Sequence, residues 1–314
     1  MSIVSSIAIN RRHFLKLMGI TAGGLVVPHA FATPAAKPEP FTFLFITDTH
    51  IEKELDAAHG TRMAFKHART IPADFAIQGG DHVFDALGVS PARATKLFDL
   101  YRKTEQDLSL KLYHTLGNHD CFGVYTHSGL SPADPRYGKK MFEACFGPTY
   151  YSFDHKGHHF VILDSIGFTP ERRYRAEIGP VQLAWLARDL AAQSSGTPII
   201  VVTHIPLTRS SHPDLKPTDP LMADGPGFIN AFETMLLLEG YNVLGVLQGH
   251  VHINKEVKFN GIRYLTCGAV CGNWWHGSRF GTPEGFTVVS VADGKLSTRY
   301  ETYGFKTIAP ETSG

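Results

Sequence analysis

Five short apolar segments of this chain each end directly at a polar side chain, and this arrangement restricts the possible folds more than any other feature. The segments are β-prone, and they lead into Asp48-Thr49-His50, Gly80-Asp81, Gly117-Asn118-His119-Asp120, Thr203-His204 and Gly249-His250-Val251-His252. The carboxyl ends of parallel strands lie at one edge of a sheet, where α/β proteins bind ligands. The sequence therefore predicts that these side chains meet in one site.

Helical and strand-like patterns alternate between these segments, and they predict a mixed α/β domain. Helices are expected over 57–69, 91–108, 180–192 and 230–239, and strands over 41–47, 75–78, 112–116, 150–154, 159–164, 199–203 and 243–248. Ser90 is a candidate N-cap, with Pro91 at the first helical position. After residue 255 the chain is predicted to contain mainly strands and hairpins, with a turn at Asp293-Gly294.

The side chains at the strand ends have the chemistry of metal ligands. Asp, Asn and neutral His are the mixed oxygen and nitrogen donors that Mn, Fe or Zn accept, and the chain contains 17 histidines. Residues 1–32 hold three basic side chains and no acid, so the other 282 residues carry 27 of the 30 basic and all 29 acidic side chains. This nearly neutral body argues against a specific nucleic-acid partner, which would require a basic face.

In their order and spacing these five blocks resemble the motifs of the calcineurin-like metallophosphoesterase family: D-x-H, G-D, G-N-H-D, an isolated His and G-H-x-H. The resemblance extends from about residue 41 to residue 299. It implies a four-layer α/β/β/α sandwich of two mixed β-sheets. The combination of D-x-H with G-N-H-D is similar to the cyclic-nucleotide phosphodiesterase branch of the family.

The resemblance also implies a role for each site residue. One metal ion would be held by Asp48, His50 and His252, and a second by Asn118, His204 and His250, with Asp81 bridging both. His119 would stand beside the metals, with Asp120 orienting it. The two ions, divalent or trivalent, are expected to be Mn, Fe or Zn.

The reaction implied is hydrolysis of a small-molecule phosphoester. Two cations activate water to hydroxide and clamp the phosphoryl oxygens, while His119 protonates the leaving oxygen as a general acid. A role for His119 in binding phosphate alone is the alternative. We expect a phosphodiesterase; the alternatives are a broad phosphomonoesterase and, in a different class, a metal-dependent binding or sensor protein without turnover.

The N-terminus has the pattern of an export signal. Arg11-Arg12 and Lys16 precede a short apolar run and Ala30-Phe31-Ala32, a small-x-small cleavage site. The paired arginines resemble the twin-arginine signal, whose cargo crosses the membrane folded. We therefore expect a signal peptide over 1–32, a linker over 33–40 and a metallophosphoesterase domain over 41–314. The twin-arginine export machinery would be a partner, and the location would be periplasmic or secreted.

Three further groups of residues have alternative interpretations. Trp274, Trp275 and His276 follow the last motif, and they could contact substrate or, for the tryptophans, plug the core. The four cysteines, Cys121, Cys145, Cys267 and Cys271, could form disulfides or remain buried thiols, whereas a cysteine metal site is disfavoured. His82 is expected to line the pocket or to face away. The histidines of the predicted turn, His155, His158 and His159, are expected at the surface.

Overall fold

The computed structural model describes residues 38–208 and 228–311, and all structural statements refer to them. The predicted signal peptide and residues 33–37 of the predicted linker lie outside the described residues. Among the described helices, none is both long enough and apolar enough to cross a membrane.

The first sheet has five strands in the order β13-β12-β1-β2-β3. They are β1 (Phe41–Ile46), β2 (Ala76–Gln78), β3 (Leu112–His114), β12 (Gly285–Ala292) and β13 (Lys295–Thr302). Strands β1, β2 and β3 are parallel, and β12 and β13 extend the sheet as an antiparallel hairpin. The parallel part therefore brings the residues that follow β1, β2 and β3 to one edge.

The second sheet has six strands in the order β10-β11-β9-β8-β5-β4. They are β4 (Tyr151–His155), β5 (His158–Leu163), β8 (Ile199–Thr203), β9 (Val243–Gln248), β10 (Lys255–Phe259) and β11 (Ile262–Thr266). The four central strands are parallel, and the two edge strands are antiparallel. A separate small hairpin is formed by β6 (Ile166–Phe168) and β7 (Tyr174–Ala176).

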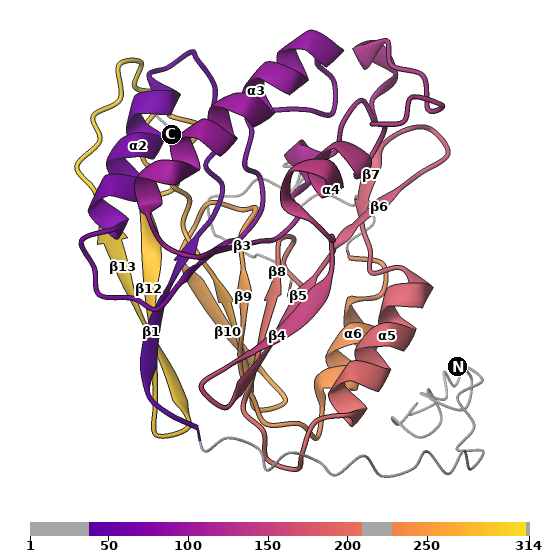
Figure 1. Ribbon diagram of the computed structural model, residues 1–314, viewed down its shortest axis with the longest axis vertical. Helices are drawn as coiled ribbons and strands as arrows, with labels where there is room; N and C mark the ends of the chain where they lie inside the picture. The colour runs from indigo at the N-terminus through magenta and orange to yellow at the C-terminus, as the bar shows by residue number, and fades with distance from the viewer. Residues whose placement is uncertain (1–37, 209–227, 312–314) are drawn as a thin grey trace, which may run out of the picture.

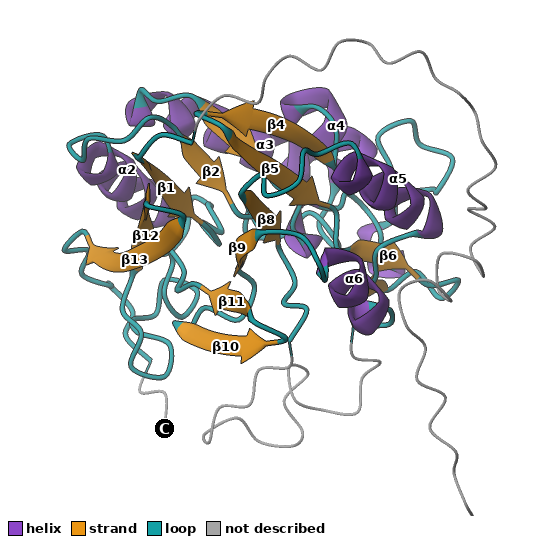
Figure 2. Cartoon of the chain, turned by 90° about the horizontal axis from the view of Figure 1, so that it is seen from below, coloured by secondary structure: helices purple, strands orange, loops and turns teal. Residues whose placement is uncertain are grey.

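Helices cover the outer faces of both sheets (Figure 1). The first sheet packs against α2 (Ala57–Ala68), α3 (Pro91–Thr104) and α4 (Lys140–Phe146), and the second against α5 (Pro180–Ala191) and α6 (Ala231–Leu238). In the view from below, α2 lies beyond one sheet and α5 and α6 beyond the other (Figure 2). The predicted four-layer α/β/β/α sandwich is confirmed.

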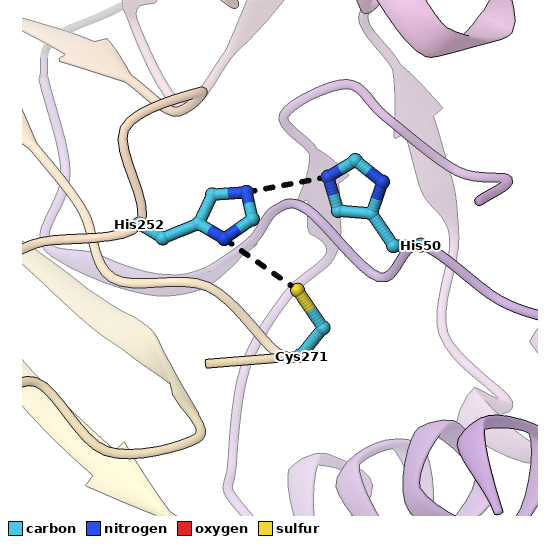
Figure 3. Close-up of side chains that lie close together, drawn as sticks. All are labelled: His50, His252 and Cys271. Carbon is cyan, nitrogen blue, oxygen red and sulfur yellow. Dashed lines mark hydrogen bonds between the residues drawn. The ribbon is translucent and has the colours of Figure 1, made fainter. Parts of the chain in front are cut away.

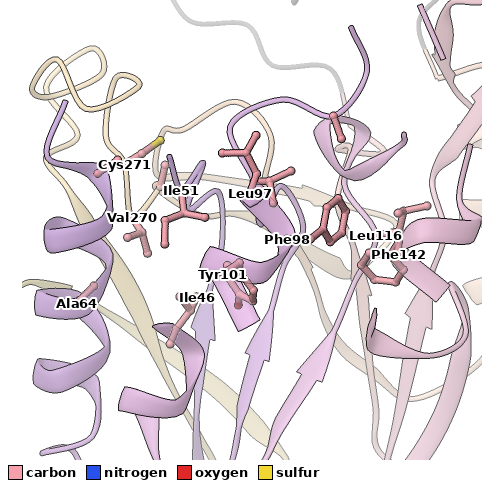
Figure 4. Close-up of a cluster of buried hydrophobic side chains, with 14 of the residues drawn as sticks. Ile46, Ile51, Ala64, Leu97, Phe98, Tyr101, Leu116, Phe142, Val270 and Cys271 are labelled. Carbon is pink, nitrogen blue, oxygen red and sulfur yellow. The ribbon is translucent and has the colours of Figure 1, made fainter. Parts of the chain in front are cut away.

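Three apolar cores hold these four layers together. One lies between the first sheet and its helices (Figure 4), and another lies between the second sheet and α5 and α6. The third fills the space between the sheets and contains Phe43, Phe45, Phe160 and Val202, all fully buried. Because each sheet is covered on both faces, its central strands are continuous apolar runs.

The predicted elements occur with small shifts. The helix expected over 91–108 divides into α3 and the 3₁₀ helix η1 (Glu105–Leu108), and the Ser90 hydroxyl accepts a hydrogen bond from Arg93 N as an N-cap does. The hairpin β6–β7 and helix α4 were not predicted. Their three-residue strands and seven-residue helix are too short to show a clear hydrophobic period.

Candidate metal centre

Every predicted metal ligand lies at or just beyond the carboxyl end of a parallel strand. Asp48 and His50 follow β1, and Asp81 follows β2. Asn118, in the 3₁₀ helix η2 (Asn118–Asp120), follows β3. His204 follows β8, and His250 and His252 follow β9. Six of the seven are at most 2% exposed, and His250 is half-buried. The two sheets thus present their strand ends to a common buried site.

The first group of donor atoms belongs to Asp48, His50 and His252. The Nε2 atoms of the two histidines are 3.2 Å apart. Asp48 Oδ1 lies 3.3 Å from Nε2 of His252 and 3.8 Å from Nε2 of His50. These three side chains therefore point toward the same position.

The second group belongs to Asn118, His204 and His250. His204 Nε2 lies 3.2 Å from Asn118 Oδ1. The His250 ring lies 5.2 Å from the His204 ring, and His250, His204 and Asp81 can offer ligand atoms within 4.8 Å of one another. The backbone N–H of His250 also donates to both oxygens of Asp48, which ties this group to the first.

Asp81 lies between the two groups. Its Oδ2 atom is 3.5 Å from His50 Nε2 in the first group and 3.1 Å from His204 Nε2 in the second. Its other oxygen accepts the backbone N–H of His119 at 2.8 Å. One carboxylate oxygen is therefore within reach of donors from both sides, as a bridging ligand requires.

These distances fit bound metal ions. Two donors that each lie about 2.1 Å from one ion, at an angle of roughly 90–110°, are about 3.0–3.4 Å apart. The closest donor pairs in both groups fall in this range, at 3.1–3.3 Å. Nitrogen and hard oxygen donors without thiolate suit Mn, Fe and Zn. The residues present therefore fit the two ions that the sequence predicted.

Backbone contacts fix the orientation of the ligand histidines. Nδ1 of His204 bonds to Gly79 O at 2.9 Å, and Nδ1 of His252 bonds to Gly272 O at 2.7 Å. Such bonds place the proton on Nδ1 and leave Nε2 free to bind a metal. At Gly80, with φ at 106°, an added Cβ would lie 2.3 Å from His204 Nδ1, so only glycine fits.

The site is also strained and highly charged. Asp48, His50, Asp81, His250 and His252 all have a positive φ, between 38° and 72°, a conformation that tends to cluster at functional sites. Burial alone would raise the pKa of Asp48, but His252 and His204 lower it to about 2. Burial would lower the pKa of His204, but Asp81 and Asp48 raise it to about 9.

His119 lies at the edge of the site with its side chain 21% exposed. Its ring lies 5.0 Å from the His50 ring. Burial would lower the pKa of His119, but the carboxylates of Asp81 and Asp85 outweigh burial and raise it. The position of His119 beside the donor groups and the direction of this shift both fit a proton donor.

The predicted role of Asp120 in orienting His119 is wrong. The Asp120 carboxylate accepts the backbone N–H groups of Gly117, Asp81 and His82, and it pairs with His82 Nδ1 at 2.8 Å. It thus clamps the loops after β2 and β3 together. The carboxylate that faces the His119 imidazole is Asp85, whose Oδ1 lies 3.6 Å from His119 Nδ1. Asp85 was missed because no strand-end pattern marks it, although it follows Asp81 by four residues.

Of the three predicted substrate contacts, only Trp274 lies at the site. Its ring is 3.9 Å from the His50 ring and 5.0 Å from the His119 ring. Trp275 is fully buried and belongs to the core. His276 bonds through Nδ1 to Ala309 O at 2.7 Å and faces Glu311 through Nε2. Trp275 therefore takes the core alternative, and the ring nitrogens of His276 face Ala309 and Glu311.

The four cysteines are free, so the thiol alternative is the one the structure shows. Cys271 lies 3.6 Å from His252 Nδ1, whereas His252 Nε2 faces His50 (Figure 3). Cys271, His50 and His252 can also offer ligand atoms within 4.8 Å of one another, but the thiol contacts Nδ1 of His252, whereas His50 and Asp48 contact Nε2. Burial raises the pKa of the Cys271 thiol, against the effect of His252, which lowers it.

The remaining histidines differ from expectation. His158 and His159 are 2% and 4% exposed, so placing them at the surface was wrong. His82 faces away from the donor groups, because its two ring nitrogens contact Asp120 and His114.

Comparisons with known proteins agree with this geometry. The sequence model of the calcineurin-like phosphoesterase family matches residues 41–254, and the chain belongs to that family. It is a metal-dependent phosphoester hydrolase.

Two solved structures show the same fold. A dimetal phosphatase from Danio rerio is 16% identical, with a TM-score of 0.59 over 85% of this chain and 98% of that chain. GAP50, the anchor in the inner membrane complex of Plasmodium, is 15% identical, with a TM-score of 0.52 over 86% of this chain and 87% of that chain. No curated protein matches the sequence.

Proposed function

We propose that this protein is a phosphodiesterase that uses two metal ions. Asp48, His50 and His252 would hold one ion, Asn118, His204 and His250 would hold the other, and Asp81 would serve both. The observation that carries this assignment is the position of Asp81 Oδ2, within 3.5 Å of a donor nitrogen from each group. A binding protein without turnover would not need a proton donor beside the centre, and His119 supplies one.

The chain's own residues divide the remaining tasks. When bound, a pair of Mn, Fe or Zn ions supplies a nucleophile at neutral pH and neutralises phosphoryl oxygens. His119 gives a proton to the oxygen that leaves, and the carboxylates of Asp81 and Asp85 raise the pKa of that imidazole. Asp120 holds the two loops that carry Asp81 and Asn118 at a constant spacing.

Two observations favour a diester over a monoester. The motifs D-x-H and G-N-H-D occur together, as in the cyclic-nucleotide phosphodiesterase branch. Asp85 adds a carboxylate beside His119. A dianionic monoester is repelled by this charge more strongly than a monoanionic diester.

The test compares bis-4-nitrophenyl phosphate, 4-nitrophenyl phosphate and cyclic nucleotides, with metal-loaded and chelator-treated protein. We expect chelator-sensitive hydrolysis with a higher kcat/KM for the diesters. A higher kcat/KM for 4-nitrophenyl phosphate would establish the phosphomonoesterase instead. No chelator-sensitive turnover of any of these esters would overturn the enzyme assignment.

We also propose export by the twin-arginine route to the periplasm or the medium. The support is the sequence of residues 1–32, with Arg11-Arg12 before an apolar run. Replacing both arginines by lysine should leave the protein in the cytoplasm, as measured by fractionation. Normal export of that variant would contradict the route.

A further inference from the structure

Two consecutive tryptophans in the turn after β11 have an unusual backbone. Trp274 and Trp275 both have positive φ, at 54° and 69°. Bulky residues rarely adopt this left-handed conformation, and where the surrounding structure enforces it, a functional role is a reasonable hypothesis. The two side chains lie in different environments, because Trp275 is fully buried and Trp274 is partly exposed.

Trp275 anchors the turn in the core. Its indole N–H donates to His50 O at 3.0 Å, and its own carbonyl accepts the hydroxyl of Thr307 at 2.5 Å. The indole packs so closely on α2 that a Cβ added at Gly60 would lie 2.2 Å from it. The ring also contacts Phe305, at 5.0 Å. The fixed position of Trp275 leaves its neighbour little freedom.

Trp274 points to the metal centre instead. Its ring lies 3.9 Å from His50, 5.4 Å from His252 and 5.0 Å from His119. Phe84 stands against it edge-on, at 5.5 Å. Both aromatic side chains remain partly exposed. An apolar wall of two rings therefore adjoins the predicted proton donor.

We propose that Trp274 and Phe84 form the leaving-group subsite and select phosphoesters whose leaving alcohol carries a flat aromatic ring, such as an aryl alcohol or a nucleoside. This inference rests on the proposed function, because His119 must stand beside the leaving oxygen. The group attached to that oxygen then lies near the partly exposed rings of Trp274 and Phe84. Aromatic rings stack on such surfaces with little dependence on their substituents.

The charge beside the wall restricts the leaving group further. Asp85 lies 3.6 Å from His119, and both of its oxygens are held by backbone N–H groups, of Leu87 and Gly88. This fixed carboxylate disfavours a leaving group that itself carries a negative charge. The subsite accordingly suits a neutral nucleoside better than a nucleotide.

The experiment measures kcat/KM for two diesters that differ in the leaving alcohol, methyl 2-naphthyl phosphate and methyl 2,2,2-trifluoroethyl phosphate. For Trp274→Ala we expect the naphthyl-to-trifluoroethyl ratio to fall about tenfold or more relative to the unmodified protein, because the naphthyl ring loses its stacking partner. Trp274→Phe should retain most of the ratio. Phe84→Leu should lower it by a smaller factor while leaving the turn intact.

The matched control is Trp185→Ala. Trp185 is a partly exposed tryptophan of α5 that packs on Tyr150, away from the site. The control variant should leave the ratio unchanged. A ratio that stays constant in both Trp274→Ala and Phe84→Leu, even if both rates fall, would show that the rings only support the metal ligands and would overturn the subsite. Absence of chelator-sensitive turnover in the unmodified protein would instead refute the proposed function.

Discussion

Two groups of buried histidines differ in how their ring nitrogens are used. In the metal centre, Nδ1 of His204 and Nδ1 of His252 each bond to a backbone carbonyl. Their Nε2 atoms face the carboxylates of Asp81 and Asp48, which also lie near other histidines of the site. His159 is equally buried, but its nitrogens bond to Asp154 and Asp189, at 2.7 and 2.8 Å. His82 is similar, with Asp120 and His114 as partners.

The difference separates ligands from structural histidines. A nitrogen that faces several other donor atoms can bind a cation together with them, whereas both nitrogens of His159 and of His82 pair with groups outside the donor set. Burial alone does not distinguish the two groups. Substitutions at the metal centre should therefore mainly lower activity and metal binding, and substitutions around the structural histidines should have smaller effects on both. Four changes test this comparison.

The largest effect is expected for Asp81→Asn. This change weakens the carboxylate whose Oδ2 lies within 3.5 Å of a donor nitrogen from each group. We therefore expect kcat/KM to fall by roughly a thousandfold or more, beyond the 10–100-fold typical of residues that only support ligands. Metal analysis should show a loss of bound metal. Asp154→Asn is the control, since that carboxylate is 78% exposed and pairs with His159. A variant at Asp81 that kept its metal and its rate would refute the bridging role.

The next largest effect is expected at His119. A change there should impair protonation of the leaving group and leave the metal content unchanged. His119→Asn should lower kcat by about 10²–10⁴-fold on esters with poor leaving groups. The loss should be much smaller with 4-nitrophenol, which leaves without a proton. Asp85→Asn should show the same dependence on the leaving group, to a smaller extent. An equal loss on every ester would argue for phosphate binding instead.

A moderate effect is expected for His82→Gln, in the structural group. His82 supports Asp120, which in turn accepts the backbone N–H of Asp81. The variant should lose about tenfold in metal affinity, the low end for supporting residues, as measured by titration with a chelator. Complete loss of metal, as expected for Asp81→Asn, would remove the distinction between the two groups.

The smallest effect on activity is expected for His159→Gln, which should change stability alone. Burial would lower the pKa of His159, but Asp189 and Asp154 raise it. Folding therefore favours the protonated form, and its stabilisation is complete below the ordinary pKa of about 6.5 and is lost as the pH rises through the raised pKa. The variant should lose about 2 kcal/mol of unfolding free energy at acidic pH, and less at alkaline pH.

Urea unfolding of the metal-loaded protein at about pH 5.5 and about pH 8.5 measures this difference. Turnover should stay close to that of the unmodified protein. A larger loss at the higher pH would contradict the assigned charge of His159.

Much of the fold and the ligand set could be predicted from the sequence because both depend on local patterns. Apolar runs that end in Asp, Asn or His identified the strands and the donors, and the order of the motifs identified the family. Elements without a clear period, such as α4 and β6–β7, could not be predicted. The residues whose role or exposure was predicted wrongly, such as Asp120 and His159, share one property. Their positions depend on contacts between segments that are distant in the chain.

The sequence by itself therefore determined which potential metal-binding side chains stand at the strand ends. Only the tertiary structure decided how neighbours in the chain divide their roles. It turned Trp274 to the metal centre and Trp275 to the core, and it placed Asp85 beside His119 while Asp120 holds His82. The physical reason is that side-chain direction at these loops follows from backbone angles, and those angles are enforced by packing and hydrogen bonds from segments far away in the chain.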